Sequence, residues 1–491
     1  MYEIRIELMS DLCAASGEGY STTIDTDVVT DKFGIPYIPA KRLKGCLRDA
    51  AVYIYGEGSE VIDKIFGVKG DISPGSLKVG NANIEEYESF SQMCRDAKQP
   101  AQKVTELFTE TIASTAVEAN GRAKDNSLRF IRTVSRSKAW NNGQNLVFCA
   151  DVEIDEVYAD PLSRICKALR HIGHKRNRGF GNIRCTLFEK RDPTLNIEAL
   201  HAVEDDKEYV ITYVVHLDES LMLPSSSENE TMDFISGQAV VGSFAEKYLK
   251  KRQADEVFDD IFLSGKFRFS NLYITDKYYS SYVPVPQIFG KTKQSDEVLD
   301  LTVKECGDAK PLKNGYINSD MKVIHPLTER VYHNSISDTN GGLYIQNCLQ
   351  NDQLFMGTIS GKGNYIKILA SLMSDGILSF GRSKTAQYSR CSLVGFDISE
   401  AAPRKLDIKK GDKVIYLFES DVLTSGDNAA SLSDVCGELG ICESNLEPES
   451  SLKYRRISGY LSVMRLQRPH TRAIAAGSSL VIKCPEDKCL D

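Results

Sequence analysis

An order of elements that occurs twice is the feature that most constrains the fold. In each half the pattern predicts a strand, a helix, a second strand, a hairpin region, another helix, a glycine loop and a last strand. The first copy has these at 2–10, from about Lys41, 76–83, 128–154, 161–172, 173–181 and 182–188. The second has them at 209–217, 235–251, 265–274, 321–359, 364–374, 381–389 and the strand that follows. A duplicated α+β unit is therefore predicted, with antiparallel sheets and helices on one face.

This duplication defines the expected domains. We predict a first domain over 1–190, a second over 205–400, and a strand-rich extension over 410–491 that packs on the second domain. The connecting segments are expected at 189–208 and 397–412, and the acidic, serine-rich stretch 425–450 is expected to be a surface loop. In the first helix, the apolar spacing predicts a buried stripe of Leu43, Leu47, Ala50, Ala51 and Ile54.

The loop between the last helix and strand of the first copy is unusually basic. Residues 161–188 contain seven Lys or Arg and no Asp or Glu, in a chain with 60 Lys plus Arg, 68 Asp plus Glu and net charge −8. An acidic protein that gathers positive charge in one glycine loop is expected to place that charge against a polyanion. Gly179 and Gly181 permit close approach to a phosphate, and Phe180 offers a face to a base. A solvated basic turn after a helix is the alternative.

Composition favours a protein that works without a membrane. No apolar run approaches the roughly 20 residues that a membrane span needs, and the alternating N-terminus MYEIRIELMSDL does not read as a signal peptide. The 13 cysteines are scattered, which favours reduced thiols in a cytoplasm over a disulfide framework. Cys484 and Cys489 form one close pair without a nearby histidine, which makes a weak zinc pattern.

Three segments together resemble a known family. GIPYIPAKRLKGCLRDAA (34–51), the loop RNRGFGNI (176–183) and FGRSKTAQYSRCSLV (380–394) are similar to the RAMP superfamily, the RNA-binding proteins of CRISPR–Cas systems. The GRSKTAQY motif and the ending RAIAAGSSLVI look most like the tandem-RAMP subunit of type III-D effector complexes. One departure is Ser389, where the family often has glycine.

The resemblance implies a fold, a function and partners. The fold would be tandem ferredoxin-like (RRM-like) domains. The function would be to bind crRNA, holding its repeat-derived 5′ tag, in antiviral defence. The partners would be crRNA, complementary target RNA and other type III Cas subunits, in the cytoplasm and with no membrane. The expected RNA-binding residues are Lys41, Arg42, Lys44, Arg48, Arg132, Arg136, Lys138, Trp140, His171, His174, Lys175, Arg176, Arg178, Gly179, Phe180, Gly181, Arg382 and Lys384. Trp140 lies at the expected hairpin tip, where it either inserts between bases or packs in the core.

Asp25 is the candidate catalytic residue. In type III RAMP subunits an aspartate before the segment resembling GIPYIP cuts target RNA, and Asp25 stands at that place. Its carboxylate would hold Mg²⁺ or Mn²⁺ or orient the attacking 2′-hydroxyl, and Asp27 and Asp31 could share a metal. The alternative is a polar loop whose acids cap a turn.

A second chemistry is open at the glycine loop. His171 and His174 flank it, and a histidine pair among basic residues suits general acid–base cleavage of RNA. This favours, as the alternative function, a stand-alone endoribonuclease that processes CRISPR repeat RNA. The histidines could equally stack on bases or pack the loop, and the sequence offers no third catalytic partner.

Overall fold

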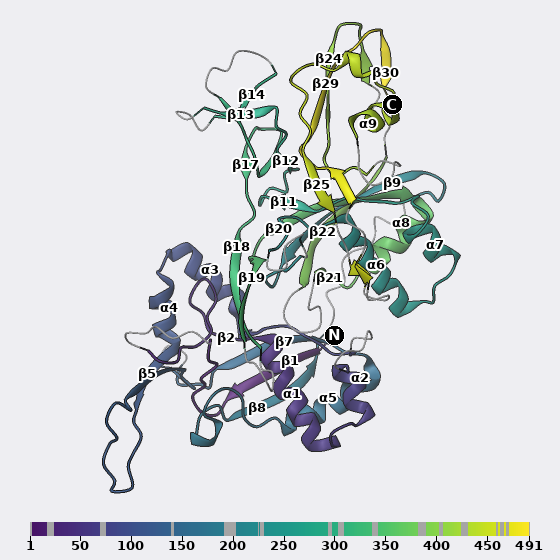
Figure 1. Cartoon of the computed structure of the whole chain (residues 1–491). Coiled ribbons are helices and arrows are strands. Elements are labelled where there is room, and N and C mark those ends of the chain that lie inside the picture. The colour runs from purple at the N-terminus through teal and green to yellow at the C-terminus, as the bar shows by residue number, and fades with distance from the viewer. Residues whose placement is uncertain are drawn as a thin grey trace. The chain divides into compact units, whose positions relative to one another are not determined.

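The chain forms two compact units. The computed structural model describes residues 2–16, 24–68, 75–138, 142–190, 203–223, 225, 230–292, 297–302, 309–335, 342–381, 389–401, 406–423, 431–457, 460–461, 466–467 and 471–490. The first unit is built on residues 1–192, and the second comprises most of 193–491. Figure 1 gives the course of the chain. No helix of the described part is both long and apolar enough to cross a membrane.

The first unit is an antiparallel sheet with helices on one face. Its strands run in the order β2–β4–β7–β1–β8, and β3 pairs with β7. In β1, every second side chain (Ile4, Ile6 and Leu8) is fully buried on the helix side. The elements of this unit are β1 (Tyr2–Leu8), β2 (Tyr37–Ile38), α1 (Ala40–Tyr55), α2 (Glu60–Phe66), β3 (Lys78–Val79), β4 (Ala82–Ile84), α3 (Tyr87–Ala97), α4 (Ala101–Phe108), β5 (Thr109–Ser114), β6 (Arg129–Val134), β7 (Val147–Glu153), α5 (Ala159–Ala168) and β8 (Ile183–Glu189).

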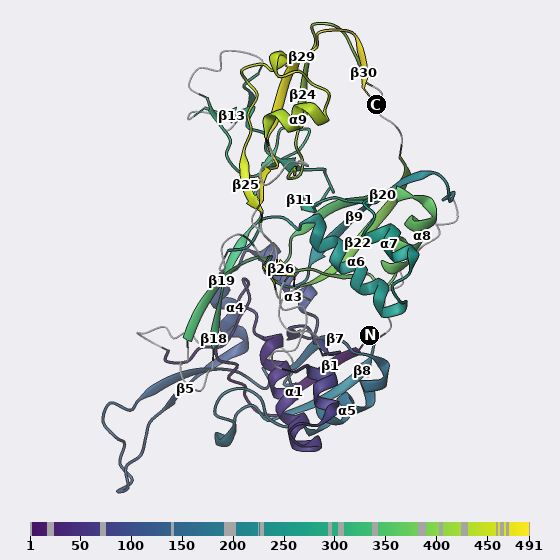
Figure 2. The same cartoon turned by 45° about the vertical axis from the view of Figure 1, so that its right-hand side comes forward.

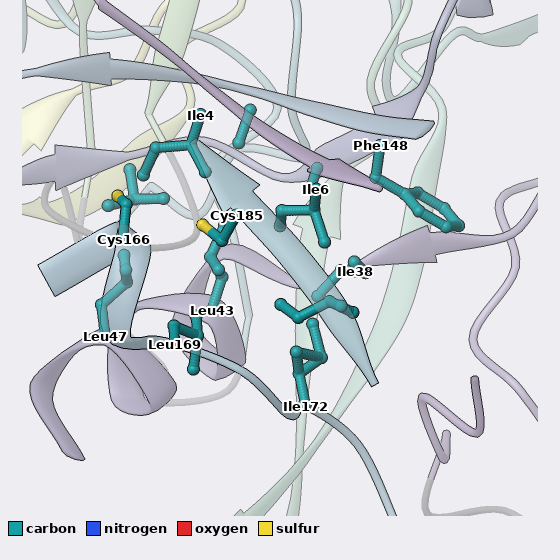
Figure 3. Close-up of a cluster of buried hydrophobic side chains, with 14 of the residues drawn as sticks. Ile4, Ile6, Ile38, Leu43, Leu47, Phe148, Cys166, Leu169, Ile172 and Cys185 are labelled. Atoms are coloured by element: carbon teal, nitrogen blue, oxygen red, sulfur yellow. The ribbon is translucent and has the colours of Figure 1, made fainter. Parts of the chain in front are cut away.

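Helix α1 packs on this sheet beside α5 (Figure 2). Asn81 Oδ1 accepts a hydrogen bond from the Ala40 backbone N–H at 2.8 Å, so a side chain from the loop before β4 satisfies one of the free amides at the start of the helix. Leu43 and Leu47 are fully buried and face Ile4 and Ile6 in the core cluster that Figure 3 shows. The expected buried stripe is confirmed except at its last member: Ile54 is 39% exposed.

The hairpin expected over 128–154 is wrong in its pairing. Strand β6 pairs with β5, and β7 pairs instead with β1, β3 and β4 in the main sheet. The alternation of β7 explains this. Phe148, Ala150 and Val152 are all fully buried, and they become so when β7 lies in the main sheet with this face against the helices. A backbone bond from the Leu146 N–H to the Arg136 carbonyl is what remains of the expected pairing.

The second unit repeats the same strand order. Its sheet runs β10–β20–β9–β22–β21, with β11 paired to β20. Strand β9 therefore lies between β20 and β22, as β1 lies between β7 and β8 in the first unit. The predicted mixture of helices and antiparallel sheet is therefore confirmed. Its main elements are β9 (Glu208–Leu217), α6 (Gly237–Lys251), α7 (Glu256–Phe262), β10 (Arg268–Phe269), β11 (Tyr273–Thr275), β20 (Leu354–Lys362), α8 (Gly363–Leu372), β21 (Ile377–Ser379) and β22 (Arg390–Glu400).

Equivalent contacts set the correspondence between the two units. The Leu12 and Leu221 amides bond the Val134 and Leu349 carbonyls, at 2.9 and 2.8 Å. Likewise, the Ile172 amide bonds the Gly181 carbonyl, and the Phe380 amide bonds that of Ser389.

Ser389 therefore occupies the position of Gly181. It keeps a φ of 117°, a left-handed value that glycine adopts far more easily. It follows that the two Arg-Cys pairs, which the sequence suggested to be equivalent, are two residues out of register: Cys391 pairs with Leu217, as Ile183 pairs with Leu8.

The remaining elements after β11 are mostly short strands, together with helix α9. Between β11 and β20 lie β12 (Val283–Pro284), β13 (Phe289–Lys291), β14 (Leu299–Asp300), β15 (Lys310–Pro311), β16 (Tyr316–Ile317), β17 (Val323–Ile324), β18 (Thr328–Ser335) and β19 (Gly342–Leu349). After β22 follow β23 (Leu406–Ile408), β24 (Lys413–Leu417), α9 (Leu432–Glu438), β25 (Tyr454–Ile457), β26 (Tyr460–Leu461), β27 (Leu466–Gln467), β28 (Thr471–Ile474), β29 (Ser479–Lys483) and β30 (Lys488–Leu490).

Two expectations for this region need correction. The stretch 425–450 is not only loop, because α9 begins at a Ser431–Asp434 capping box and buries Val435 and Cys436. The expected connecting segment 397–412 begins inside β22, which continues through Glu400. The extension contacts the sheet through the Tyr273 hydroxyl, which donates to the Glu419 carbonyl.

Candidate nucleic-acid interface

Three glycines shape the basic loop of the first unit. Gly173, Gly179 and Gly181 have φ values of 88°, 85° and 68°. A Cβ on Gly173 would lie 2.6 Å from the Cys13 carbonyl oxygen, and one on Gly181 would lie 1.9 Å from that of Ile172. Around Gly179, by contrast, there is open space. Two of the glycines therefore fasten the loop to the body of the unit, and Gly179 is the one at which another molecule can approach the backbone.

The loop presents its cations in a short 3-10 turn, Arg176–Arg178. Arg176 and Arg178 are exposed, as are His171 and His174. Lys175 is half-buried in a left-handed conformation, and its Nζ lies 3.5 Å from Ser114 Oγ. Two exposed guanidiniums on a short, glycine-bounded turn are a suitable arrangement for a phosphate. Phe180, next to them in sequence, is half-buried.

The four cations of α1 divide into two kinds. Lys41 and Arg48 are exposed. Lys44 is half-buried, and its Nζ donates to the Leu77 carbonyl at 2.8 Å; burial lowers the pKa of this amine to about 8. Burial also lowers the pKa of Arg42, whose Nη2 donates to the Ala15 carbonyl at 2.6 Å and whose Nη1 is buried without a partner among the described residues. Lys41 and Arg48 thus face solvent, whereas Lys44 and Arg42 hold loops to the helix.

The loop and α1 share one electrostatic environment. Burial raises the pKa of the Cys46 thiol on α1, and the nearby charges of Arg176 and Arg42 act against this rise. Burial likewise raises the pKa of Cys13, against the charges of Arg42 and Lys175. The glycine loop therefore lies beside the first turns of α1. The fold brings together positive charges that are more than 120 residues apart in sequence.

Three of the expected RNA-binding cations are engaged within the protein. Arg132 forms an ion pair with the buried Asp27 at 3.0 Å. Arg136 donates from Nε to Asn145 Oδ1 at 2.9 Å, and Lys138 forms an ion pair with Glu110 at 2.8 Å. These contacts hold β6 and the segment after it to their neighbours. Three further residues that were expected to bind RNA, Trp140, Arg382 and Lys384, lie outside the described residues.

The three aspartates of the loop before β2 have separate surroundings. Asp25 is exposed, and its Oδ2 accepts a hydrogen bond from the Phe130 amide at 2.7 Å. Asp27 is paired with Arg132. Asp31 accepts bonds from two turn amides and from the Tyr87 hydroxyl, and burial raises its pKa. Asp27 and Asp31 are thus held by different groups of the protein, and the suggestion that they share a metal stays a prediction.

The described residues show no other candidate metal cluster. Within the residues that the structure describes, no group of three or more His, Cys, Asp or Glu side chains could hold a metal ion. The Cys484 thiol is free and buried.

The helix-free face of the first sheet carries ion pairs. Lys190 lies 2.7 Å from Asp151, Arg184 lies 3.0 Å from Glu7, and Arg5 pairs with Glu85. Proteins that read single-stranded RNA on such a sheet stack bases on exposed aromatic rings there. This face does carry one such ring: Phe188 is 50% exposed, and the Arg5 guanidinium lies 5.8 Å from its ring centroid, so the ring is shared with a cation of the protein.

The sequence reasoning missed the residues that hold this interface in place. Asn81 accepts a hydrogen bond from the first amide of α1. The Cys13 carbonyl lies against Gly173 of the glycine loop, and the Ala15 carbonyl accepts a hydrogen bond from Arg42. One signal was available: the asparagine recurs in the second copy as Asn271, where it accepts a bond from the Gly237 amide at 2.8 Å. The backbone contacts left no trace in the sequence.

Comparison with known proteins gives one family. Residues 5–184 match the model of the RAMP superfamily, which confirms the resemblance over the first unit. The sequence matches no curated protein. Among the similar solved structures are a type III-B Cmr-beta complex bound to cognate target RNA and one in the apo state. Their matched chains are 13% and 12% identical, with TM-scores of 0.31 and 0.30, and each match covers 38% of this chain and 97% of the other.

Proposed function

From the match of residues 5–184 to the RAMP superfamily, we propose that this chain is a crRNA-binding subunit of a type III CRISPR–Cas effector complex. The two units, with helix α1 or α6 between the first two strand positions of each sheet, are taken as tandem ferredoxin-like domains. The chain would hold the repeat-derived 5′ tag of the guide, among other Cas subunits and against target RNA. The observation that carries the proposal is the cluster of exposed cations on the glycine loop and α1 of the matched unit.

The physical argument is one of charge. The protein has net charge −8, so a general attraction to RNA is absent, and binding requires a local positive surface. Arg176 and Arg178 supply it on the loop, and Lys41 and Arg48 supply it on the helix beside the loop. Gly179 adds an unhindered stretch of backbone between them and Phe180. Phosphate contacts of this kind position an RNA without reading its sequence.

The first experiment identifies the ligand. The protein is purified from its native cell with the nucleic acid that it holds, and the RNA is sequenced. Guides with one fixed, repeat-derived 5′ end are expected. RNA of random origin, or no RNA, would refute the proposal. Cleavage of free repeat RNA by the purified chain alone would favour the processing nuclease instead.

A second experiment locates the grip. The Arg176→Ala/Arg178→Ala variant should bind 5′-tagged RNA less tightly, with a weaker salt dependence, because fewer counterions are released. Lys409→Ala/Lys410→Ala is the matched control, since it removes two exposed cations of the C-terminal extension. Equal effects of the two variants would show that only net charge matters and that the loop is not the interface.

Target cleavage by Asp25 is the finer part of the proposal. The proposed role of Asp25 is to hold Mg²⁺ or Mn²⁺ or to orient the attacking 2′-hydroxyl. Asp25→Asn keeps an oxygen that can accept a hydrogen bond from the Phe130 amide. In an assembled complex it should abolish one cut in a complementary target and leave RNA affinity nearly unchanged. Wild-type cutting at every position by this variant would make Asp25 a loop residue only.

A further inference from the structure

Each unit contains a helix at the same place in its sheet. Matching hydrogen bonds at the start of α1 and α6 align the two helices residue by residue. In the first unit the Ala40 amide bonds Asn81 Oδ1 at 2.8 Å, and in the second the Gly237 amide bonds Asn271 Oδ1 at 2.8 Å. Ala40 therefore corresponds to Gly237, and each later position of α1 corresponds to the residue of α6 that lies 197 further along.

The buried faces of the two helices agree under this register. Leu43 corresponds to Val240 and Leu47 to Phe244, and all four side chains are fully buried in the cores of their units. The exposed Gly45 corresponds to Gly242, also exposed. The second helix thus packs as the first does, and the fold places the same surface positions at the same edge of the sheet.

The two helices carry their cations at different positions. The four cationic positions of α1, at 41, 42, 44 and 48, correspond to uncharged residues of α6, which are Gln238, Ala239, Val241 and Ala245. Core packing does not explain the loss of Lys41 and Arg48 in α6, because both side chains are exposed in α1. A difference at the two exposed positions, 41 and 48, between two helices with matching cores points to a difference in what each surface binds.

The loop that accompanies each helix differs at one of its glycines. At the position of Gly181 the second unit has Ser389, buried and with a φ of 117°. At its far end, Gly381 retains the role of Gly173: a Cβ there would lie 2.4 Å from the Met222 carbonyl oxygen. The second loop is therefore fastened at one end as the first is, but the glycine at its other end has been replaced.

We propose that the helix-borne part of the RNA grip exists in the first unit only. Lys41 and Arg48 of α1 contact phosphates of the guide, and the equivalent face of α6 holds no phosphate. The duplicated unit keeps the fold of the RNA-binding domain without this half of its binding surface. The inference rests on the proposed function, because it assigns a site within the RNA-binding role.

The test transfers the second helix's residues to the first. Lys41→Gln/Arg48→Ala places in α1 the residues found at the same positions of α6. Lys250→Gln/Lys251→Ala removes two exposed cations of α6 with the same loss of charge. The dissociation constant of each protein for 5′-tagged RNA is measured from low to high salt. Thermal unfolding is recorded in parallel to show that both variants fold.

The two outcomes separate the claims. The α1 variant should lower the magnitude of the slope of log K against log salt by about 1.4, the value for two phosphates of a single strand, and the α6 variant should leave it unchanged. An unchanged slope for the α1 variant, or an equal loss for the α6 variant, would overturn this inference while RNA binding stands. A wild-type chain that binds no tagged RNA would instead overturn the proposed function. Lys41→Gln alone, expected to lower the slope by about 0.7, serves if the double variant fails to fold.

Discussion

His216 is expected to make the second unit less stable as pH rises above neutrality. Its Nδ1 lies 3.0 Å from Asp218 Oδ1 and its Nε2 lies 3.1 Å from Asp352 Oδ1. Burial by itself lowers the pKa of His216, but the two carboxylates more than compensate and raise it to about 9. The imidazolium therefore lies between two acceptors on the helix-free face of β9, and its side chain is only 30% exposed.

The sign and size of the effect follow from this pKa. An unfolded histidine has a pKa of about 6.5, so the folded state binds the proton more tightly. The stabilisation is complete below pH 6.5 and is lost as pH rises through about 9. The full change in pKa corresponds to about 3 kcal/mol, and solvent screening at a partly exposed site reduces this to about 1–2 kcal/mol.

The assay is hydrogen exchange of peptides from β9 and β20, followed by mass spectrometry at pH 6 and pH 9 after correction for intrinsic rates. Wild type should lose protection between these values. His216→Asn should be less protected at pH 6 and nearly independent of pH. His171→Asn, at an exposed position in the first unit, is the control. An equal pH dependence in wild type and His216→Asn would refute the reasoning.

Two further predictions use pairs of positions. Gly181→Ala should lower the free energy of unfolding by about 2–4 kcal/mol, because a left-handed φ is combined with a backbone clash, whereas Gly179→Ala should cost only about 1 kcal/mol; chemical denaturation measures both. Tyr213→Phe should raise stability by about 1 kcal/mol, since the hydroxyl it removes is buried and has no partner in the part of the chain that the structure describes. Tyr248→Phe should lower stability by a similar amount, because that hydroxyl donates to a carboxylate at 2.8 Å. A stabilising Tyr248→Phe or a mild Gly181→Ala would contradict the assigned contacts.

The local patterns of the sequence predicted several of the main helices and strands. The stripe from Leu43 to Ala51 predicts α1 because the spacing of buried residues on a helix is a property of the helix itself. The alternation in β1 and β9 predicts strands for the same reason. The basic glycine loop could be recognised because its composition departs from that of the whole chain.

Tertiary structure decided what each charge does. Lys41 and Lys44 have the same residue type on the same helix face, yet only Lys44 meets a carbonyl of a neighbouring loop. Arg132 reads as a free cation until the fold brings the buried Asp27 to it, 105 residues away in sequence. Strand pairing was equally hidden, because β7 alternates in the same way whether it pairs with β6 or with β1. A periodicity is carried by consecutive residues, whereas the partner of a cation or of a strand edge comes from a distant segment and is fixed only when the chain has folded.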